Sequence, residues 1–365
     1  MTQGSTSGYP ETRPPRPPSR LARLWQARSV FQRHGGSPDA NRHPPTSPDR
    51  NKHLQTVSKP SRRRQFFPLF LLISIFGGAA VGFSILRLDT SNTAASRMFI
   101  STNQFDEWLA IVCGVLGISV AVSYWTWPSF LRMARVVSRT SLISTVLVYA
   151  LMAALVACIP FITTGGNVSF GLSHFYVRIT ILTALLLIAG AGSFCGLILI
   201  WYKQYADIGD IQAKAGDTVR AILSTRSDIQ RFFTGATVLI TCGVVIIGGL
   251  RSALDAVRSI YFTTNTATIS VGELILYGIL FAMLLAFVLV LSYTAWRTRV
   301  ASFRDHLFPI PDDGKPPKDW YEGRSDLEDL LALRLGLTGR FLAALGILAP
   351  LIGSIITIVI PTSRG

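Results

Sequence analysis

Charged residues are scarce in this 365-residue chain: Asp, Glu, Lys and Arg together make up 15% of it, against about 25% in a soluble domain. Hydrophobic residues make up 49%, and the mean hydropathy is +0.41. The apolar residues are grouped into stretches near or above the roughly 18 residues that cross a bilayer. This composition excludes an ordinary water-soluble globular protein and predicts an integral membrane protein.

Signatures of catalysis and of metal binding are lacking as well. The four cysteines lie in apolar stretches and form no Cys-x-x-Cys pair, so we expect them to pack as small hydrophobic side chains. No His-Glu-x-x-His, Gly-x-Ser-x-Gly or phosphate-binding Gly-x4-Gly-Lys sequence occurs. We therefore expect no catalytic residue, no metal and no cofactor, and a membrane-embedded enzyme is the last of three functional hypotheses.

Seven apolar segments follow an N-terminal tail. Each is long enough, or nearly so, to cross roughly 30 Å of hydrocarbon at about 1.5 Å per residue. No Asp, Glu, Lys, Arg or His stands in the middle of any of them. The sequence thus predicts an all-α polytopic membrane protein. Its seven predicted transmembrane helices cover residues 66–86, 108–125, 142–163, 179–202, 232–250, 271–296 and 341–361.

The distribution of positive charge predicts the orientation of these helices. With the N-terminus in the cytoplasm, 29 of the 35 Lys and Arg residues lie on the cytoplasmic side. Cytoplasmic loops carry an excess of Lys and Arg, so the N-terminus is predicted inside and the C-terminus outside. Topology alone accounts for the net charge of +15, so nucleic acid is not an expected partner. Five tryptophans mark predicted span ends, where indole rings favour the headgroup region: Trp108, Trp125, Trp127, Trp201 and Trp296.

Residues 1–65 form the tail, which is rich in Pro, Arg and Ser. Such a segment buries too little apolar surface to offset its ordering entropy, so a disordered basic tail is predicted. Within it, Ser19–His34 is a candidate amphipathic helix for an anionic membrane surface. Three basic residues next to the first span are predicted to contact anionic lipid: Arg62, Arg63 and Arg64. The expected location is a bacterial cytoplasmic membrane; an organelle membrane, with the tail as a transit peptide, is the alternative.

The rest of the chain, 66–365, is predicted to be the membrane domain, with two long cytoplasmic segments. In 203–231, apolar residues near helical spacing alternate with charged ones, which predicts a helical hairpin that extends spans four and five. In segment 297–340, residues 305–324 contain four prolines between 309 and 317, so they are expected to form an irregular loop. Ser325 and Glu328 have the spacing of a capping box and predict the start of a helix there.

Small residues and a proline stand inside the spans. Two pairs of glycines have the four-residue spacing that lets helices pack closely: Gly78 with Gly82, and Gly192 with Gly196. Their partner is either within the bundle, another protein or a second copy of the chain. Pro350, flanked by Gly346 and Gly353, is predicted to kink span seven. Such a kink either serves packing or lines a gate.

Three functional hypotheses fit these features. Because ion-coupled transporters usually keep an ionisable group in the bundle, its absence from the predicted spans counts against a charge-driven transporter. The first hypothesis is a non-enzymatic scaffold, sensor or membrane-acting effector that engages partners or lipids through its cytoplasmic segments. The second is a channel or carrier for a neutral or hydrophobic solute, and the third is the membrane-embedded enzyme. A solvated polar cavity at mid-membrane would favour the second, and clustered carboxylates or histidines at one interface the third.

Overall fold

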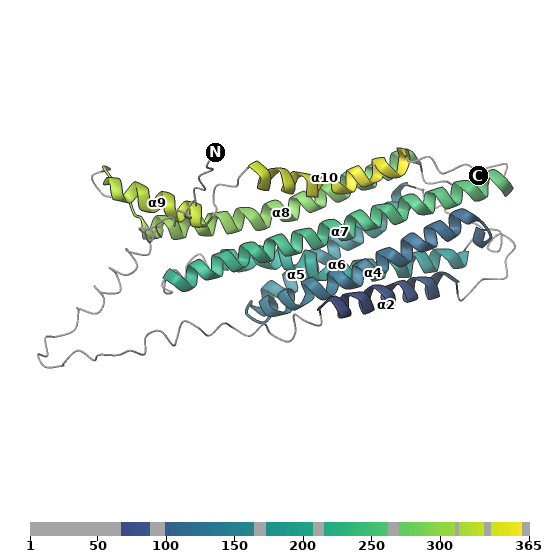
Figure 1. Cartoon of the computed structure of the whole chain (residues 1–365), viewed down its shortest axis with the longest axis horizontal. Helices are drawn as coiled ribbons and strands as arrows, with labels where there is room; N and C mark the ends of the chain where they lie inside the picture. The colour runs from purple at the N-terminus through teal and green to yellow at the C-terminus, as the bar shows by residue number, and fades with distance from the viewer. Residues whose placement is uncertain are drawn as a thin grey trace, which may run out of the picture. The chain divides into compact units, whose positions relative to one another are not determined.

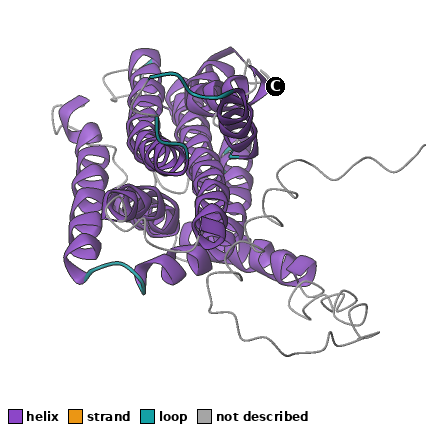
Figure 2. Cartoon of the chain, turned by 90° about the vertical axis from the view of Figure 1, so that its left-hand side faces the viewer, coloured by secondary structure: helices purple, strands orange, loops and turns teal. Residues whose placement is uncertain are grey.

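The described part of the chain consists of helices joined by short loops. The computed structural model describes residues 67–87, 99–163, 173–206, 215–261, 270–310, 314–331 and 337–359. Figure 2 shows helices and loops in these ranges and no strand. The helices, labelled in Figure 1, are α2 (Phe67–Arg87), α4 (Asn103–Ala134), α5 (Arg139–Thr163), α6 (Ser173–Ala206), α7 (Ala215–Tyr261), α8 (Val271–Leu307), α9 (Lys318–Leu330) and α10 (Leu337–Val359).

Six of these helices, α2 and α4 to α8, are long and apolar enough to cross a membrane by length and composition. The described part of α10 contains a shorter apolar helix, Ala344–Ile356. Each of the seven predicted spans therefore coincides with a helix, and the predicted fold class, an all-α polytopic membrane protein, is confirmed. The orientation of the termini stays a prediction.

The chain divides into two compact units. The larger unit contains α2 to α8, α10 and the last three residues of α9; among the described residues, the smaller unit consists of 314–327. The tail 1–65, with its candidate helix Ser19–His34 and the three arginines at 62–64, lies outside the described residues.

Several helices are longer than the spans predicted within them. α7 has 47 residues, about 70 Å at 1.5 Å per residue, which is more than twice the hydrocarbon thickness of roughly 30 Å. α4 does not end near Trp125 but continues through Pro128 to Ala134. In the predicted hairpin, α6 extends to Ala206 and α7 begins at Ala215. Polar residues that follow the apolar segments are therefore held on rigid helices.

Side-chain caps fix where two long helices begin. The Ser270 hydroxyl accepts the Glu273 N–H at 3.1 Å, and the Glu273 carboxylate accepts the Ser270 N–H at 2.8 Å, which is a complete capping box for α8. Thr102 caps α4 by accepting the Phe105 N–H at 3.2 Å. The capping box predicted at Ser325 is wrong, because α9 begins seven residues earlier, at Lys318.

α4 and α7 lie at the centre of the larger unit. α4 packs against α2, α6 and α7, while α7 also packs against α8 and α10; α5 packs mainly against α6. The explanation of the tryptophans by headgroup contact alone is incomplete. Trp108 and Trp296 are each 1% exposed. Their indole N–H groups donate to the carbonyls of Ile246 and Ile222, at 3.1 and 3.3 Å, so both rings bind α7.

The outward helix faces carry large apolar side chains. Phe76 of α2, Leu151 of α5 and Met283 of α8 are each about two-thirds exposed. Contiguous exposed apolar surface is rare on soluble monomers, but it is what a bilayer covers. The packing of the bundle thus agrees with the composition of the spans.

Candidate functional site

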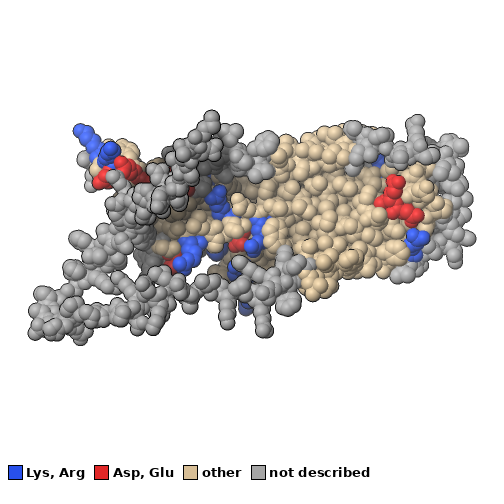
Figure 3. Space-filling view, in the orientation of Figure 1, with Lys and Arg blue, Asp and Glu red and all other residues tan. Residues whose placement is uncertain are grey.

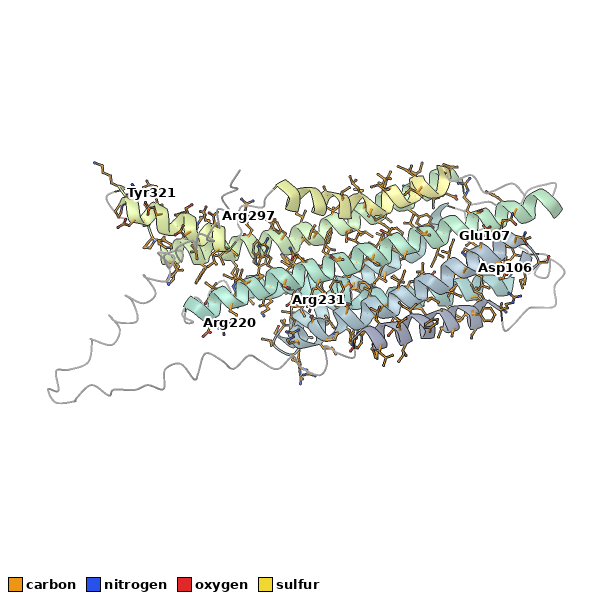
Figure 4. The ribbon with its side chains drawn as sticks, viewed as in Figure 1. Asp106, Glu107, Arg220, Arg231, Arg297 and Tyr321 are labelled. Carbon is orange, nitrogen blue, oxygen red and sulfur yellow. The ribbon has the colours of Figure 1, made fainter. Side chains whose placement is uncertain are left out.

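Charged residues of the larger unit gather toward its two ends. Figure 3 shows a broad band without described Lys, Arg, Asp or Glu on the face drawn, with charged side chains on either side of it. In Figure 4, Arg220, Arg231 and Arg297 lie toward one end, and Asp106 and Glu107 toward the other. We call the end with these arginines the basic end. It is the end that the positive-inside prediction assigns to the cytoplasm.

Two arginines from different helices converge on one hydroxyl at the basic end. Ser129 of α4 is 1% exposed. Its hydroxyl oxygen lies 3.3 Å from a terminal nitrogen of Arg132, one turn further along α4. Arg231 of α7 donates to the same oxygen. Helices α4 and α7 are therefore joined by a small polar contact just beyond the apolar stretch of each.

Among the described residues, one carboxylate lies among the cations at this point. The Asp228 carboxylate is 3.7 Å from the Arg231 guanidinium, and it also interacts electrostatically with Arg132 of α4 and Lys203 of α6. We call Ser129, Arg132, Lys203, Asp228 and Arg231 the basic cluster. Three cations against one carboxylate leave the cluster with an excess of two positive charges.

Aromatic side chains place the basic cluster at the edge of the apolar band. The Arg231 guanidinium lies 5.9 Å from the centre of the Trp125 ring, within the range of a cation–π contact. Trp125 and Trp127 are 38% and 40% exposed, unlike the two buried tryptophans of the bundle. Exposed indole rings of this kind favour the headgroup region of a bilayer.

A second polar contact joins α6, α7 and α8 at the same end. Gln204 of α6 is fully buried. Its amide nitrogen donates to the Thr225 hydroxyl of α7 at 3.4 Å, and its amide oxygen accepts from Arg299 of α8 at 3.2 Å. We call these three residues the polar junction. They fix the long helices relative to one another beyond the predicted spans.

Ion pairs at the opposite end are matched one to one. Arg87 lies 3.4 Å from Asp106, and Arg251 lies 3.5 Å from Asp255. Arg178, 9% exposed, donates to the Leu86 carbonyl at 2.9 Å, where a cation also complements the C-terminal dipole of α2. Among the described residues, these two ion pairs each balance one positive charge with one negative charge, unlike the basic cluster.

The structure places both predicted glycine pairs in helix contacts inside the bundle. A Cβ on Gly78 would lie 2.7 Å from the backbone of Gly117, so α2 and α4 meet there main chain to main chain. Gly82 lies against Leu116 of α4. Gly192 and Gly196 make room for the rings of Trp127 and Phe232. All four glycines therefore have a partner within the chain.

The residues around the predicted kink of span seven are also packed. Gly346 lies against the Phe233 ring of α7, and Gly353 lies near Thr241 of the same helix. Pro350 is buried. Its carbonyl accepts the Ser354 hydroxyl at 3.2 Å, and Ser354 in turn fills the space left by Gly278 of α8.

The sequence reasoning missed the basic cluster. Span two was predicted to end near Trp125, so Arg132 was counted only as positive charge in a cytoplasmic loop and was not placed on a helix. The available signal was the three-residue spacing of Ser129 with Arg132 and of Asp228 with Arg231, which places each pair on one helix face. Their convergence depends on how α4 packs against α7, and the sequence does not show that contact.

The fold and the charge distribution define the class of the protein as an integral, multi-pass membrane protein. No family model, curated protein or solved structure matches the chain. Among the described residues, no group of three or more His, Cys, Asp or Glu side chains is placed to hold a metal ion. The basic cluster is the candidate site considered below, because it brings Arg132, Lys203 and Arg231 close to one carboxylate.

Proposed function

We propose that the protein is a non-enzymatic multi-pass membrane protein, a scaffold, sensor or membrane-acting effector, that engages anionic lipids or acidic partners at its basic end. The observation that carries the proposal is the uncompensated charge of the basic cluster, held on three rigid helices. Near an anionic leaflet, each basic residue contributes on the order of 1 kcal/mol of attraction. The basic end is thus suited to recognise negative charge at the membrane surface.

The packing of the middle of the bundle supports this function over a carrier for a neutral solute. Gly346 and Gly353 lie against side chains of α7, and Ser354 binds the carbonyl of Pro350. A gate at this position would need these contacts to open. The charged residues, in contrast, are already placed at the edge of the apolar band, where a headgroup or an acidic segment can reach them.

The functional test is the response of the full-length protein to the charge of its bilayer. Thermal unfolding is compared in nanodiscs of phosphatidylcholine alone and in nanodiscs that also contain phosphatidylglycerol. The unfolding midpoint should be higher with the anionic lipid, and the difference should shrink between about 0.01 M and about 1 M salt, where the Debye length falls from about 30 Å to about 3 Å. Equal midpoints at low salt would contradict the proposal, and protein-dependent flux of a neutral solute into vesicles would favour the carrier.

We also propose that the basic end lies in the cytoplasm of a bacterial cell. Single cysteines replacing Arg220 and Glu107, both exposed and at opposite ends, test this orientation in a chain whose native cysteines have been replaced. In intact cells a membrane-impermeant maleimide should label the cysteine at 107 and spare the one at 220. Labelling at 220 alone would reverse the orientation and place the basic cluster outside.

A further inference from the structure

We propose that Ser129, Arg132 and Arg231 form a specific binding site for the phosphate group of one anionic phospholipid. This inference rests on the proposed function, because both place recognition of negative charge at the basic end. It goes further by naming one ligand, one location and the side chains that hold it.

The first argument is the supply of hydrogen-bond donors. The Ser129 hydroxyl accepts one N–H from Arg132 and one from Arg231, whereas each guanidinium carries five N–H donors. Two guanidinium groups that meet at one point can present further donors to a single oxyanion. Arginine forks match the geometry of phosphate oxygens and bind them in pairs.

The second argument is charge. Asp228 balances one of the three cations around it, so the basic cluster keeps an excess of two positive charges. Like charges repel one another more strongly where one of them is partly buried, as Arg231 is, since water screens a partly buried charge less. A bound phosphate lowers this repulsion, and it does so between α4 and α7, which supply one arginine each.

The third argument concerns the source of the phosphate. Leu131, next to Arg132 in the chain, is 40% exposed, and Tyr124, one residue before Trp125, is 42% exposed. Apolar and aromatic surface thus continues from the arginines toward the apolar band. A phospholipid lays acyl chains along such a surface while its phosphate stays at the level of the exposed tryptophans, whereas free phosphate gains nothing from it. We therefore assign the site to a lipid.

Native mass spectrometry of the full-length protein in detergent tests the site directly. The protein is titrated with phosphatidylglycerol, with phosphatidylcholine and with inorganic phosphate. We expect the first phosphatidylglycerol to bind more tightly than further phosphatidylglycerol molecules and more tightly than phosphatidylcholine. Inorganic phosphate at millimolar concentration should leave this first lipid bound. Equal binding of both lipids would overturn the proposal, and displacement of the lipid by inorganic phosphate would identify a site for the soluble anion instead.

Two substitutions with a matched control locate the binding. Arg231→Gln and Arg132→Gln should each weaken the first phosphatidylglycerol about ten-fold, which corresponds to the loss of one charge-assisted hydrogen bond. Arg297→Gln removes one exposed cation from the same end and should change the affinity little. Arg132 is exposed, so its replacement keeps the test valid even if Arg231→Gln fails to fold. An equal effect of all three substitutions would show diffuse attraction and no specific site.

Asp228→Asn separates ligand binding from a purely structural role of the basic cluster. Removing the carboxylate raises the excess charge from two to three, so phosphatidylglycerol should bind several-fold more tightly. If the cluster only holds α4 against α7, the same change should lower stability without tightening any lipid. Weaker binding to the Asn variant would overturn the proposal.

The two proposals fail in different ways. If the double variant Arg132→Gln, Arg231→Gln keeps both the first lipid and the stabilisation in anionic nanodiscs, the site is wrong while the general function stands. If the unsubstituted protein shows no preference for anionic lipid in either measurement, both proposals fail.

Discussion

The middle of the bundle and its basic end respond to different properties of a side chain. In the middle, α2 and α4 touch through Gly78 and Gly117, so the volume of a side chain decides whether it fits. The apolar band in Figure 3 shows no charged described side chain. At the basic end, Arg132 and Arg231 share one hydroxyl, and the limiting quantity is charge. The comparison suggests that the middle determines whether the protein folds and that the basic end determines what it binds.

The largest expected effect comes from adding volume to the middle. Gly78→Leu would place a side chain where a Cβ already meets the Gly117 backbone at 2.7 Å, and backbone cannot move aside as a side chain does. Overpacking typically costs about 1–3 kcal/mol and occasionally more, so we expect a loss of about 3 kcal/mol in the free energy of unfolding. Thermal unfolding in nanodiscs measures it.

The neighbouring glycine is the matched control for that prediction. A Cβ on Gly77 would meet nothing within 4 Å, and Gly77 is exposed on the same helix. Gly77→Leu should leave the unfolding midpoint nearly unchanged. Equal losses for the two substitutions would mean that the contact between α2 and α4 does not limit the volume of the side chain at position 78.

The next largest effect is expected at the polar junction. Gln204→Leu removes the acceptor of Arg299 and the donor to Thr225 while preserving much of the volume. Loss of a partner for a buried polar group costs about 1–3 kcal/mol, and we expect a loss in that range in the free energy of unfolding. Gln230→Leu, at an exposed position of α7, should cost far less. If Gln204→Leu leaves the free energy of unfolding unchanged, charge and polarity matter little where α6, α7 and α8 meet.

Pro350→Ala should have a smaller effect and should sharpen the distinction between packing and gating. Alanine restores an N–H that can bond within α10, which is worth about 0.5–1.5 kcal/mol, but it also disturbs the contacts of a buried residue. We expect a change in the free energy of unfolding within about 1 kcal/mol and no change in the preference for anionic lipid. Pro128→Ala, exposed in α4, is the control. A solute flux that depends on Pro350 would instead support a gate.

The smallest effect is expected at the end opposite the basic cluster. Arg87 and Asp106 form an ion pair whose side chains are 49% and 61% exposed, and such surface pairs contribute about 0–1 kcal/mol. Arg87→Gln should change the free energy of unfolding by about 0.5 kcal/mol or less. Arg304→Gln should cost more, because the Arg304–Glu328 pair is 2.9 Å long with side chains only about one-fifth exposed. Equal losses of unfolding free energy for Arg87→Gln and Arg304→Gln would mean that burial does not change the contribution of these ion pairs.

The fold could be predicted from the sequence because hydrophobicity along the chain determines which segments enter a bilayer. Composition and segment length were enough to locate helices that include the unusually long α7, although its start at Ala215 could only be approximated. The start of α9 was missed because Ser325 and Glu328 have the spacing of a cap but stand inside the helix. Local spacing does not show which partner a side chain finds, and Glu328 binds Arg304 instead.

The candidate site was harder to predict for the same physical reason. Ser129 and Arg231 are 102 residues apart in the chain, and only the packing of two helices brings them together. Trp108 and Trp296 show a related difficulty. A tryptophan at a span end can face lipid or bind a neighbouring helix, and its position in the sequence does not distinguish the two. The glycine spacings were informative about close packing, but the identity of each partner required the three-dimensional structure.

The length of α7 has a mechanical consequence. A rigid rod of about 70 Å that is held in a bilayer over less than half its length acts as a lever. A small change of tilt within the hydrocarbon is converted into a larger lateral displacement of the segment between Ala215 and Arg231, together with the residues of α6 and α8 that contact it through Thr225 and Ile222. Arg231 lies nearer the apolar band than Arg220 does, so the same change of tilt would displace Arg220 further than Arg231.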